Sequence, residues 1–181
     1  MRIGAGRQRG RKLAAPRGRD LRPTAGRTRE ALFDILMHGA PPLAGAHFLD
    51  LFAGTGAIGL EAWSRGAAEV LMVEEDPPAL DLIRANLARL GHPPGVRLLA
   101  LDATRLGPAA QTFDLVFLDP PYRSGLAAPA LTGLVAGGWL KATSRVVVEL
   151  AAKEPFIPPP GFITEDERRY GAARLVFLRP E

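Results

Sequence analysis

Short apolar runs alternate with helical patterns along most of this chain, and this alternation constrains the fold more than any other sequence feature. Strands are expected at residues 47–52, 69–73, 96–101, 113–118 and 145–150. Helices are expected between them, at residues 57–65, 77–90 and 126–135. Strands that alternate with helices, and that are buried on both faces, are typical of a parallel sheet. The sequence therefore predicts an α/β protein with a mostly parallel central sheet.

The two ends of the chain extend this pattern. Residues 162–168 and 173–178 flank Tyr170-Gly171 and predict an antiparallel hairpin at one edge of the sheet. Pro23 and Thr24 provide a helix start signal, and the apolar spacing after them predicts a helix that ends near Gly39. We therefore divide the chain into an N-terminal extension, residues 1–40, and a main domain, residues 41–181.

The basic side chains are concentrated before the predicted sheet. Up to Glu30, the chain carries ten arginine and lysine side chains and only two acidic ones, whereas the rest of the chain carries 13 basic and 17 acidic side chains. A basic arm on a mildly acidic body favours contact with a nucleic acid, although a solvated tail has the same composition. Two arrangements of the arm are open at this point: a short hairpin, or a segment that becomes ordered only on RNA.

Several classes of site are excluded by what the sequence lacks. The chain contains no cysteine, so disulfides, thiolate metal sites and cysteine nucleophiles are impossible. His38, His47 and His92 are scattered, and we expect no metal. No apolar run approaches the roughly 20 residues that a membrane span needs, and the basic N-terminus is unlike a secretory signal. We therefore expect a monomeric, cytoplasmic protein without a membrane partner.

A glycine-rich loop follows the first predicted strand. Gly54, Gly56 and Gly59 have the spacing G-x-G-x-x-G, and Glu74 ends the second strand, where a ribose-binding acid is expected. These residues alone are compatible with an NAD enzyme or with a plain strand-to-helix turn. Asp50 argues against NAD, because a carboxylate before the glycines would repel the pyrophosphate. S-adenosylmethionine has a sulfonium, an ammonium and no phosphate, so it suits these acidic surroundings better.

The predicted cofactor site extends from this loop to the end of the third strand. Asp102 follows that strand and can accept a hydrogen bond from an adenine amino group, although aspartate is also a common capping residue. Glu75 and Asp76 are alternative ribose partners, but its position at the strand end favours Glu74. The sequence predicts cofactor contacts at Asp50, Phe52, Ala53, Gly54, Thr55, Gly56, Glu74, Asp102 and Ala103.

The fourth predicted strand runs directly into Asp119-Pro120-Pro121-Tyr122. The two prolines fix φ and prevent a helix from starting, so they hold the loop rigid at the carboxyl end of the sheet. The Asp119 carboxylate and the Pro120 carbonyl can accept hydrogen bonds from the exocyclic amine of a base and stabilise the charge that develops on it. Tyr122 offers a stacking face for that base. We interpret Asp119, Pro120, Pro121 and Tyr122 as a catalytic loop; a plain Pro-Pro turn is the structural alternative.

These motifs resemble those of a known family. The glycine loop together with residues 119–122 looks like the class I amino-methyltransferases of nucleic acid. Residues 9–13, 21–24, 27–33, 56–62 and 64–67 are similar to the bacterial 16S rRNA guanine-N2 methyltransferase family, and the similarity spans nearly the whole chain. The resemblance implies a Rossmann-like methyltransferase domain with a small N-terminal extension, and S-adenosylmethionine as methyl donor. It also implies that the substrate is one guanine of 16S rRNA in the small ribosomal subunit or an assembly intermediate.

By the same resemblance, Arg22 and Thr24 are expected near the catalytic loop, with Thr24 at the cofactor; a simple helix N-cap is the alternative for Thr24. RNA contacts are expected from Arg7, Arg9, Arg11, Lys12, Arg22 and Arg123. Two stretches depart from the family pattern, the Arg-rich residues 14–20 and the proline run 158–160.

Three other functions stay open on the sequence. An adenine-N6 methyltransferase uses the same loop chemistry, but it usually needs a larger target-recognition region. A protein glutamine methyltransferase is expected to have asparagine in place of Asp119. A non-enzymatic RNA-binding module would explain the basic arm and leave both loops without a purpose.

Overall fold

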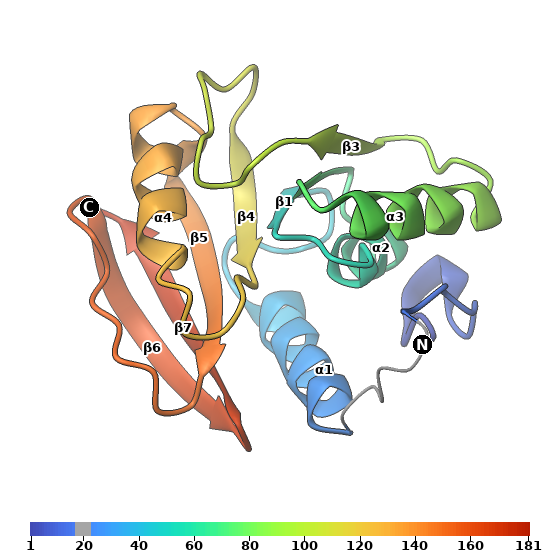
Figure 1. Ribbon diagram of the computed structural model, residues 1–181, viewed down its shortest axis with the longest axis horizontal. Coiled ribbons are helices and arrows are strands. Elements are labelled where there is room, and N and C mark those ends of the chain that lie inside the picture. Colours follow the sequence, from blue (N-terminus) through green and yellow to red (C-terminus); the bar gives the residue numbers. More distant parts are fainter. Residues whose placement is uncertain (17–22) are drawn as a thin grey trace.

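The computed structural model describes residues 1–16 and 23–181 (Figure 1). The strands are β1 (His47–Leu51), β2 (Glu69–Glu74), β3 (Val96–Ala100), β4 (Phe113–Leu118), β5 (Leu140–Ala151), β6 (Phe162–Tyr170) and β7 (Ala173–Pro180). The helices are a 3-10 turn η1 (Gly6–Gln8), α1 (Pro23–His38), α2 (Ala57–Ser64), α3 (Pro77–Arg89) and α4 (Ala127–Ala136). No described helix is long and apolar enough to cross a membrane.

The strands form one sheet in the order β3-β2-β1-β4-β5-β7-β6. The first five of these are parallel to their neighbours, and β7 is antiparallel to both β5 and β6. The predicted parallel sheet with an antiparallel hairpin at one edge is therefore confirmed. The strand order reverses between β1 and β4, and ligands of such sheets bind beyond the strand ends at this switch point.

Alternating side chains of the strands build two apolar clusters, one on each face of the sheet. One face carries Phe48, Met72 and Phe117 and is covered by α1, α2 and α3. The other face carries Leu49 and Val116, among others, and is covered by α4. Along each central strand, side chains that point to one face thus alternate with side chains that point to the other. This alternation fixes the register of the central strands and the position of their carboxyl ends.

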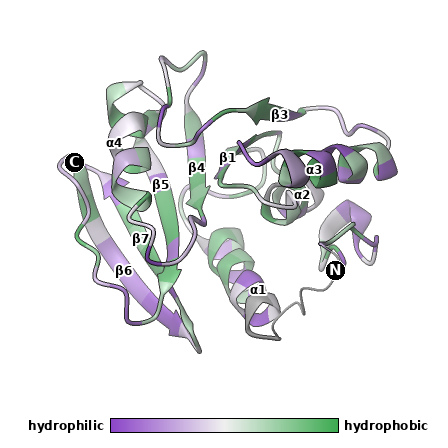
Figure 2. Ribbon diagram, viewed as in Figure 1, coloured by the Kyte–Doolittle hydropathy of each residue, from purple (hydrophilic) through white to green (hydrophobic). Residues whose placement is uncertain are grey.

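Two strand predictions need correction. β3 is an edge strand that only α3 covers, so it is not buried on both faces, and Leu99 is exposed. β5 begins at Leu140, five residues earlier than expected, because a register shift lets it pair with the start of β4. Ser144 stabilises this irregular stretch, since its hydroxyl donates to the Phe113 carbonyl and accepts from the Lys141 backbone N–H. The outermost strand, β6, is largely hydrophilic (Figure 2).

The start of the chain forms a short hairpin, which is one of the two arrangements left open by the sequence. An antiparallel bridge joins Arg2 to Lys12, and the Ile3 backbone N–H donates to the Arg11 carbonyl at 3.0 Å. Ile3 and Leu13 are buried in the same apolar cluster that α1 and α2 enter. The hairpin therefore packs on the sheet domain through its own apolar side chains.

Candidate active site

The loop between β1 and α2 contains three residues with positive φ: Phe52 at 59°, Gly54 at 56° and Gly56 at 74°. A Cβ on Gly56 would lie 2.9 Å from the Met72 sulfur, and one on Gly59 would lie 2.8 Å from the Met72 Cγ. These two glycines are thus required where α2 packs against β2. Among the described residues, and apart from its chain neighbours, a Cβ on Gly54 would meet nothing within 4 Å. Gly54 is therefore the glycine of this loop that has open space beside its backbone.

Asp50 lies beneath this loop rather than on its surface. Its side chain is buried, and one carboxyl oxygen accepts a hydrogen bond from the Gly59 backbone N–H at 2.9 Å. Burial raises the pKa of Asp50 to about 7; the Gly59 hydrogen bond opposes this, and the nearby charge of Glu74 adds to it. The structure thus gives Asp50 a part in shaping the loop. Direct contact between its side chain and a cofactor stays an untested prediction.

Glu74 is fixed beside the glycine loop at the end of β2. Its Oε2 accepts from the Gly54 backbone N–H at 2.8 Å, and its Oε1 accepts from the backbone N–H groups of Glu75 and Asp76. The Asp76 side chain caps α3 instead, by accepting from the Ala79 backbone N–H. The local geometry therefore favours Glu74 over Asp76 as the acid that faces a ligand at this loop.

Asp102 and Ala103 follow β3, the next strand along the same edge of the sheet. The backbone N–H and the hydroxyl of Thr104 both donate to one oxygen of Asp102, and these bonds lower the pKa of its carboxyl. Asp102 therefore stays ionised as an acceptor, with its second oxygen outside these bonds. Ala103 is buried in the apolar cluster under α4. Gly54, Glu74 and Asp102 thus stand at the carboxyl ends of three adjacent strands, β1, β2 and β3.

The Asp119-Pro120-Pro121-Tyr122 loop lies at the switch point between β1 and β4. The Asp119 backbone N–H donates to the Leu51 carbonyl at 3.3 Å, so the loop is joined to the end of β1 just before the glycine loop. Pro120 is buried, whereas Tyr122 is 40% exposed and presents its ring at the surface. The Arg123 backbone N–H donates to Glu154 at 2.9 Å, which holds the far side of the loop. The catalytic and cofactor loops predicted from the sequence are therefore adjacent.

Asp119 belongs to an acidic pair that the sequence did not predict. The pKa of its carboxyl is raised well above the ordinary value, because the surrounding protein displaces water and because Glu149 and Asp50 are negatively charged neighbours. Burial also raises the pKa of Glu149, against the effect of a hydrogen bond that the Tyr122 hydroxyl donates to it at 3.0 Å. Asp119 nevertheless reaches the surface, so a base can approach it. Hydrogen-bond donors on that base would favour the ionised form of the pair.

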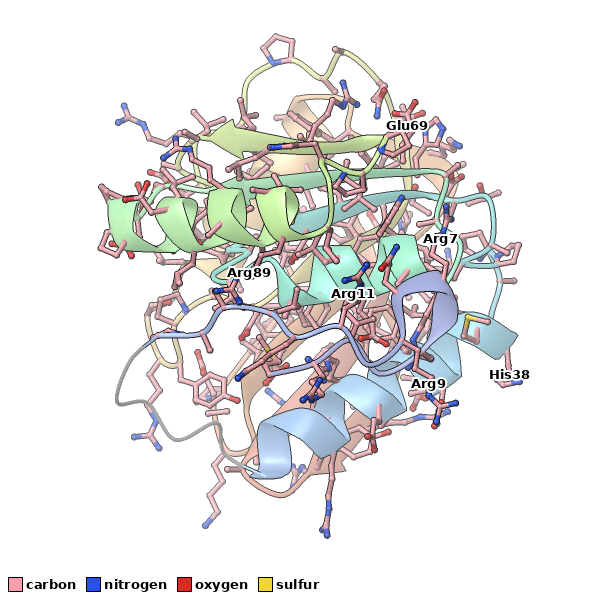
Figure 3. All side chains as sticks on the ribbon, turned by 90° about the vertical axis from the view of Figure 1, so that its right-hand side faces the viewer. Arg7, Arg9, Arg11, His38, Glu69 and Arg89 are labelled. Atoms are coloured by element: carbon pink, nitrogen blue, oxygen red, sulfur yellow. The ribbon has the colours of Figure 1, made fainter. Side chains whose placement is uncertain are left out.

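Arg7, Arg9 and Arg11 of the predicted RNA-binding side chains lie on one side of the protein, where the hairpin runs between α1 and α3 (Figure 3). Arg9 and Lys12 are exposed there, and Arg11 contacts the side chain of Gln8. Arg7 forms a cation–π contact within the protein, because its guanidinium lies 4.9 Å above the ring centre of Trp63. Trp63 and Trp139 are buried, as expected for packing residues. Arg22 and the Thr24 side chain lie outside the part of the chain that the structure describes.

Two buried polar side chains fasten the arm to the domain. Asn86 on α3 accepts from the Ala14 backbone N–H at 2.6 Å and donates to the carbonyls of Ala14 and Thr55. Glu61 on α2 accepts from the backbone N–H groups of Gly4 and Ala5. Sequence reasoning missed both residues, since their partners are distant in the chain. Asn86 links the arm to the glycine loop directly, because Thr55 belongs to that loop.

We expect Asn86→Ala to lower the free energy of unfolding by about 1–3 kcal/mol, because partly buried backbone groups of Ala14 and Thr55 lose their partner. Cofactor affinity should fall as well, since the Thr55 carbonyl is no longer held. Chemical denaturation and calorimetric titration measure the two effects. Arg84→Ala, on an exposed position of the same helix, is the control and should change stability by less than about 0.5 kcal/mol. Equal effects of the two substitutions would contradict this role of Asn86.

Among the described residues, no group of three or more His, Cys, Asp or Glu side chains could hold a metal ion. A Rossmann-like sheet, a glycine loop with room at Gly54, and an Asp-Pro-Pro-Tyr loop at the switch point together define a class I methyltransferase fold. Solved structures agree with this class. The chain matches a putative methyltransferase of Escherichia coli with a TM-score of 0.84 and 34% identity, over 100% of this chain and 98% of that one. A putative methylase of Haemophilus influenzae gives 0.81 and 32%, over 99% and 97%.

Sequence comparison defines the family. The family model described as conserved hypothetical protein 95 matches residues 1–179, and the chain belongs to that family. A relative from Haemophilus influenzae named ribosomal RNA small subunit methyltransferase D is 35% identical over 175 residues, which cover 94% of this chain and 89% of the relative. The Escherichia coli protein of the same name is 40% identical over 151 residues, which cover 82% and 74%. The family resemblance inferred from the motifs is therefore confirmed.

Proposed function

We propose that this protein transfers a methyl group from S-adenosylmethionine to the exocyclic N2 amine of a guanine in 16S rRNA of the small ribosomal subunit. The observation that carries the proposal is the position of the Asp119-Pro120-Pro121-Tyr122 loop, joined to the end of β1 beside the glycine loop. The names of the relatives support the choice of small-subunit RNA. The substrate is either the assembled subunit or an assembly intermediate.

The residues at the strand ends fit S-adenosylmethionine. The room beside Gly54 suits a ligand that lies against bare backbone, because a Cβ there would meet no atom within 4 Å from the part of the chain that the structure describes, its own neighbours aside. Glu74 is a fixed carboxylate for ribose hydroxyls, and Asp102 is an ionised acceptor for the adenine amino group. Thr24 remains a further proposed contact. The chemistry that the bound cofactor supplies is a methyl group activated by a sulfonium.

The catalytic loop supplies acceptors for the amine. The lone pair of an exocyclic amine is delocalised into the base, so the amine is a poor nucleophile until its N–H groups are oriented. Asp119 and the Pro120 carbonyl accept these N–H bonds and stabilise the positive charge that develops on nitrogen. Bound S-adenosylmethionine would supply the methyl group and would be left as the neutral thioether, and the methylated amine would lose one proton to solvent. Tyr122 stacks on the base.

The pH dependence of the reaction should reflect the raised pKa of Asp119. Glu149, Asp50 and the Tyr122 hydroxyl are the titratable groups around it, and the two acids raise its pKa. Asp119 must be ionised to accept an amine N–H, so kcat/KM should rise with pH through a limb well above the ordinary carboxyl pKa of about 4. The rate profile of single turnovers checks this. A rate that stayed constant down to about pH 5 would contradict it.

The exposed basic residues of the hairpin are proposed to bind RNA phosphates. Arg9→Gln with Arg11→Gln should weaken RNA binding and reduce the slope of log affinity against log salt by roughly 1 for each lost phosphate contact. Cofactor affinity should stay the same. Arg97→Gln with Arg179→Gln, two exposed arginines on β3 and β7 that lie outside the hairpin, forms the matched control. An unchanged salt slope in the hairpin variant would show that the arm does not bind the phosphates.

The proposed activity is tested by methyl transfer from labelled S-adenosylmethionine. Small subunits that lack the modification are the substrate, and free 16S rRNA, large subunits and duplex DNA are compared with them. We expect label in 16S rRNA and almost none in large subunits or DNA. Transfer into DNA would favour an adenine-N6 methyltransferase, and RNA binding without any transfer would favour the non-enzymatic RNA-binding module.

A further inference from the structure

Glu149 stands beside Asp119 but has no part in the chemistry described so far. β4 and β5 are parallel neighbours in which Leu118 lies opposite Val148. Leu118 is followed by Asp119, just after β4, and Val148 is followed by Glu149 in β5. The two acids therefore stand side by side at the carboxyl end of the sheet. β7 pairs with the other side of β5 and places Leu175 opposite Glu149. The backbone of Glu149 is thus held between two neighbouring strands.

The catalytic loop also contacts the Glu149 side chain. The Tyr122 hydroxyl donates to its Oε1 at 3.0 Å, which ties the proposed stacking ring to this acid. Within residues 1–16 and 23–181, no lysine or arginine forms a salt bridge with Asp119 or Glu149. Asp119 is exposed and Glu149 is partly buried, so a ligand that covers the two carboxylates displaces water from them and must supply hydrogen-bond donors in its place. The pair therefore fits a ligand that offers two adjacent donors.

Among the bases, the donor pattern of guanine matches this pair. The Watson–Crick edge of guanine presents N1–H next to the N2 amine, which gives two adjacent donors. Adenine and cytosine present their exocyclic amine next to an unprotonated ring nitrogen, which is an acceptor. A carboxylate facing that nitrogen would repel it, whereas a carboxylate facing N1–H forms a charge-assisted hydrogen bond.

We propose that Glu149 accepts a hydrogen bond from N1–H of the target guanine, while Asp119 accepts from the N2 amine, and that Glu149 thereby selects guanine over the other bases. This inference rests on the proposed function and deepens it. The Tyr122 hydroxyl occupies Oε1 and leaves Oε2 for the base. Selectivity of this kind is strong, because a site built to bind an N–H leaves buried polar groups unpaired when the N–H is missing.

The test removes N1–H from the substrate base. 2-Aminopurine keeps the N2 amine of guanine, lacks O6 and has an unprotonated N1, and comparison with a Glu149 variant separates the effect of N1 from that of O6. Small subunits are reconstituted with 16S rRNA that carries guanine or 2-aminopurine at the target position, and single-turnover kcat/KM is measured on both. The wild-type protein should prefer guanine by at least about 100-fold. In Glu149→Gln this ratio should fall at least about tenfold, because an amide can also donate to N1.

Controls separate recognition from folding and from loop movement. Glu149→Gln should bind S-adenosylmethionine with unchanged affinity. Glu154→Ala removes the acceptor of the Arg123 backbone N–H and so disturbs the same loop; it should lower both rates by the same factor and keep the ratio. An unchanged ratio in Glu149→Gln, or an equal change in Glu154→Ala, would overturn the role of Glu149. If the wild-type protein methylates neither substrate, the proposed function itself fails.

Discussion

Asp119→Ala should lower the rate of methyl transfer by about 100- to 1,000-fold, which is the usual cost of losing one preorganised group that stabilises transition-state charge. The carboxylate is needed mainly while positive charge develops on the amine, so the loss should appear in turnover. Cofactor affinity should remain, because Asp119 follows β4, whereas the cofactor groups follow β1, β2 and β3. Single-turnover rates on unmodified subunits and a separate cofactor titration measure the two quantities.

A second aspartate provides the control for this substitution. Asp81 lies on α3, where its side chain is 77% exposed and contacts Arg84 at 2.9 Å. Asp81→Ala should leave the transfer rate within about twofold of the wild type, since substitutions of exposed side chains outside the active site have small effects. A near-normal rate in Asp119→Ala would remove the catalytic role of the Asp-Pro-Pro-Tyr loop and would favour an RNA-binding module.

Gly54→Leu should abolish detectable binding of S-adenosylmethionine. The added side chain would occupy the open space beside the loop, and φ at this position is 56°. Strain alone costs about 1–2 kcal/mol for a residue with a Cβ in this conformation, so a folded protein is expected. Calorimetric titration of the folded variant measures binding.

Gly91 is a closely matched control. It also has a positive φ, 73°, and a Cβ there would meet nothing within 4 Å in residues 1–16 and 23–181 apart from its chain neighbours, but it lies after the far end of α3. Gly91→Leu should therefore show a similar loss of stability and a normal cofactor affinity. Normal cofactor affinity in folded Gly54→Leu would mean that the cofactor does not lie against Gly54.

The alternation of strands and helices in the sequence was sufficient to predict the parallel sheet, the closing hairpin and the position of both loops at the carboxyl ends of strands. These features depend on local periodicity and on the rule that parallel strands end at one edge. β3 was predicted less well, because its apolar residues look like those of a central strand. Its exposure follows from its place at the edge of the sheet, and strand order is not encoded in local periodicity.

Long-range contacts account for the residues that sequence reasoning missed. Asn86 and Ala14 are 72 residues apart, and Glu61 and Gly4 are 57 apart, so no local pattern connects them. Glu149 has a signal in the sequence, since it lies near the end of the fifth strand, but only its pairing with β4 places it beside Asp119. Asp50 was interpreted from its position next to the glycines, whereas its burial depends on α2 packing over β1.

The identity of the methylated nucleoside tests directly whether a guanine N2 amine in 16S rRNA receives the methyl group. Unmodified small subunits are incubated with the protein and S-adenosylmethionine, the 16S rRNA is digested, and the nucleosides are analysed by mass spectrometry against standards. We expect N2-methylguanosine at close to one per subunit with the wild-type protein, and a strongly reduced yield at early times with Asp119→Ala. N6-methyladenosine in its place, or no methylated nucleoside at all, would contradict the account.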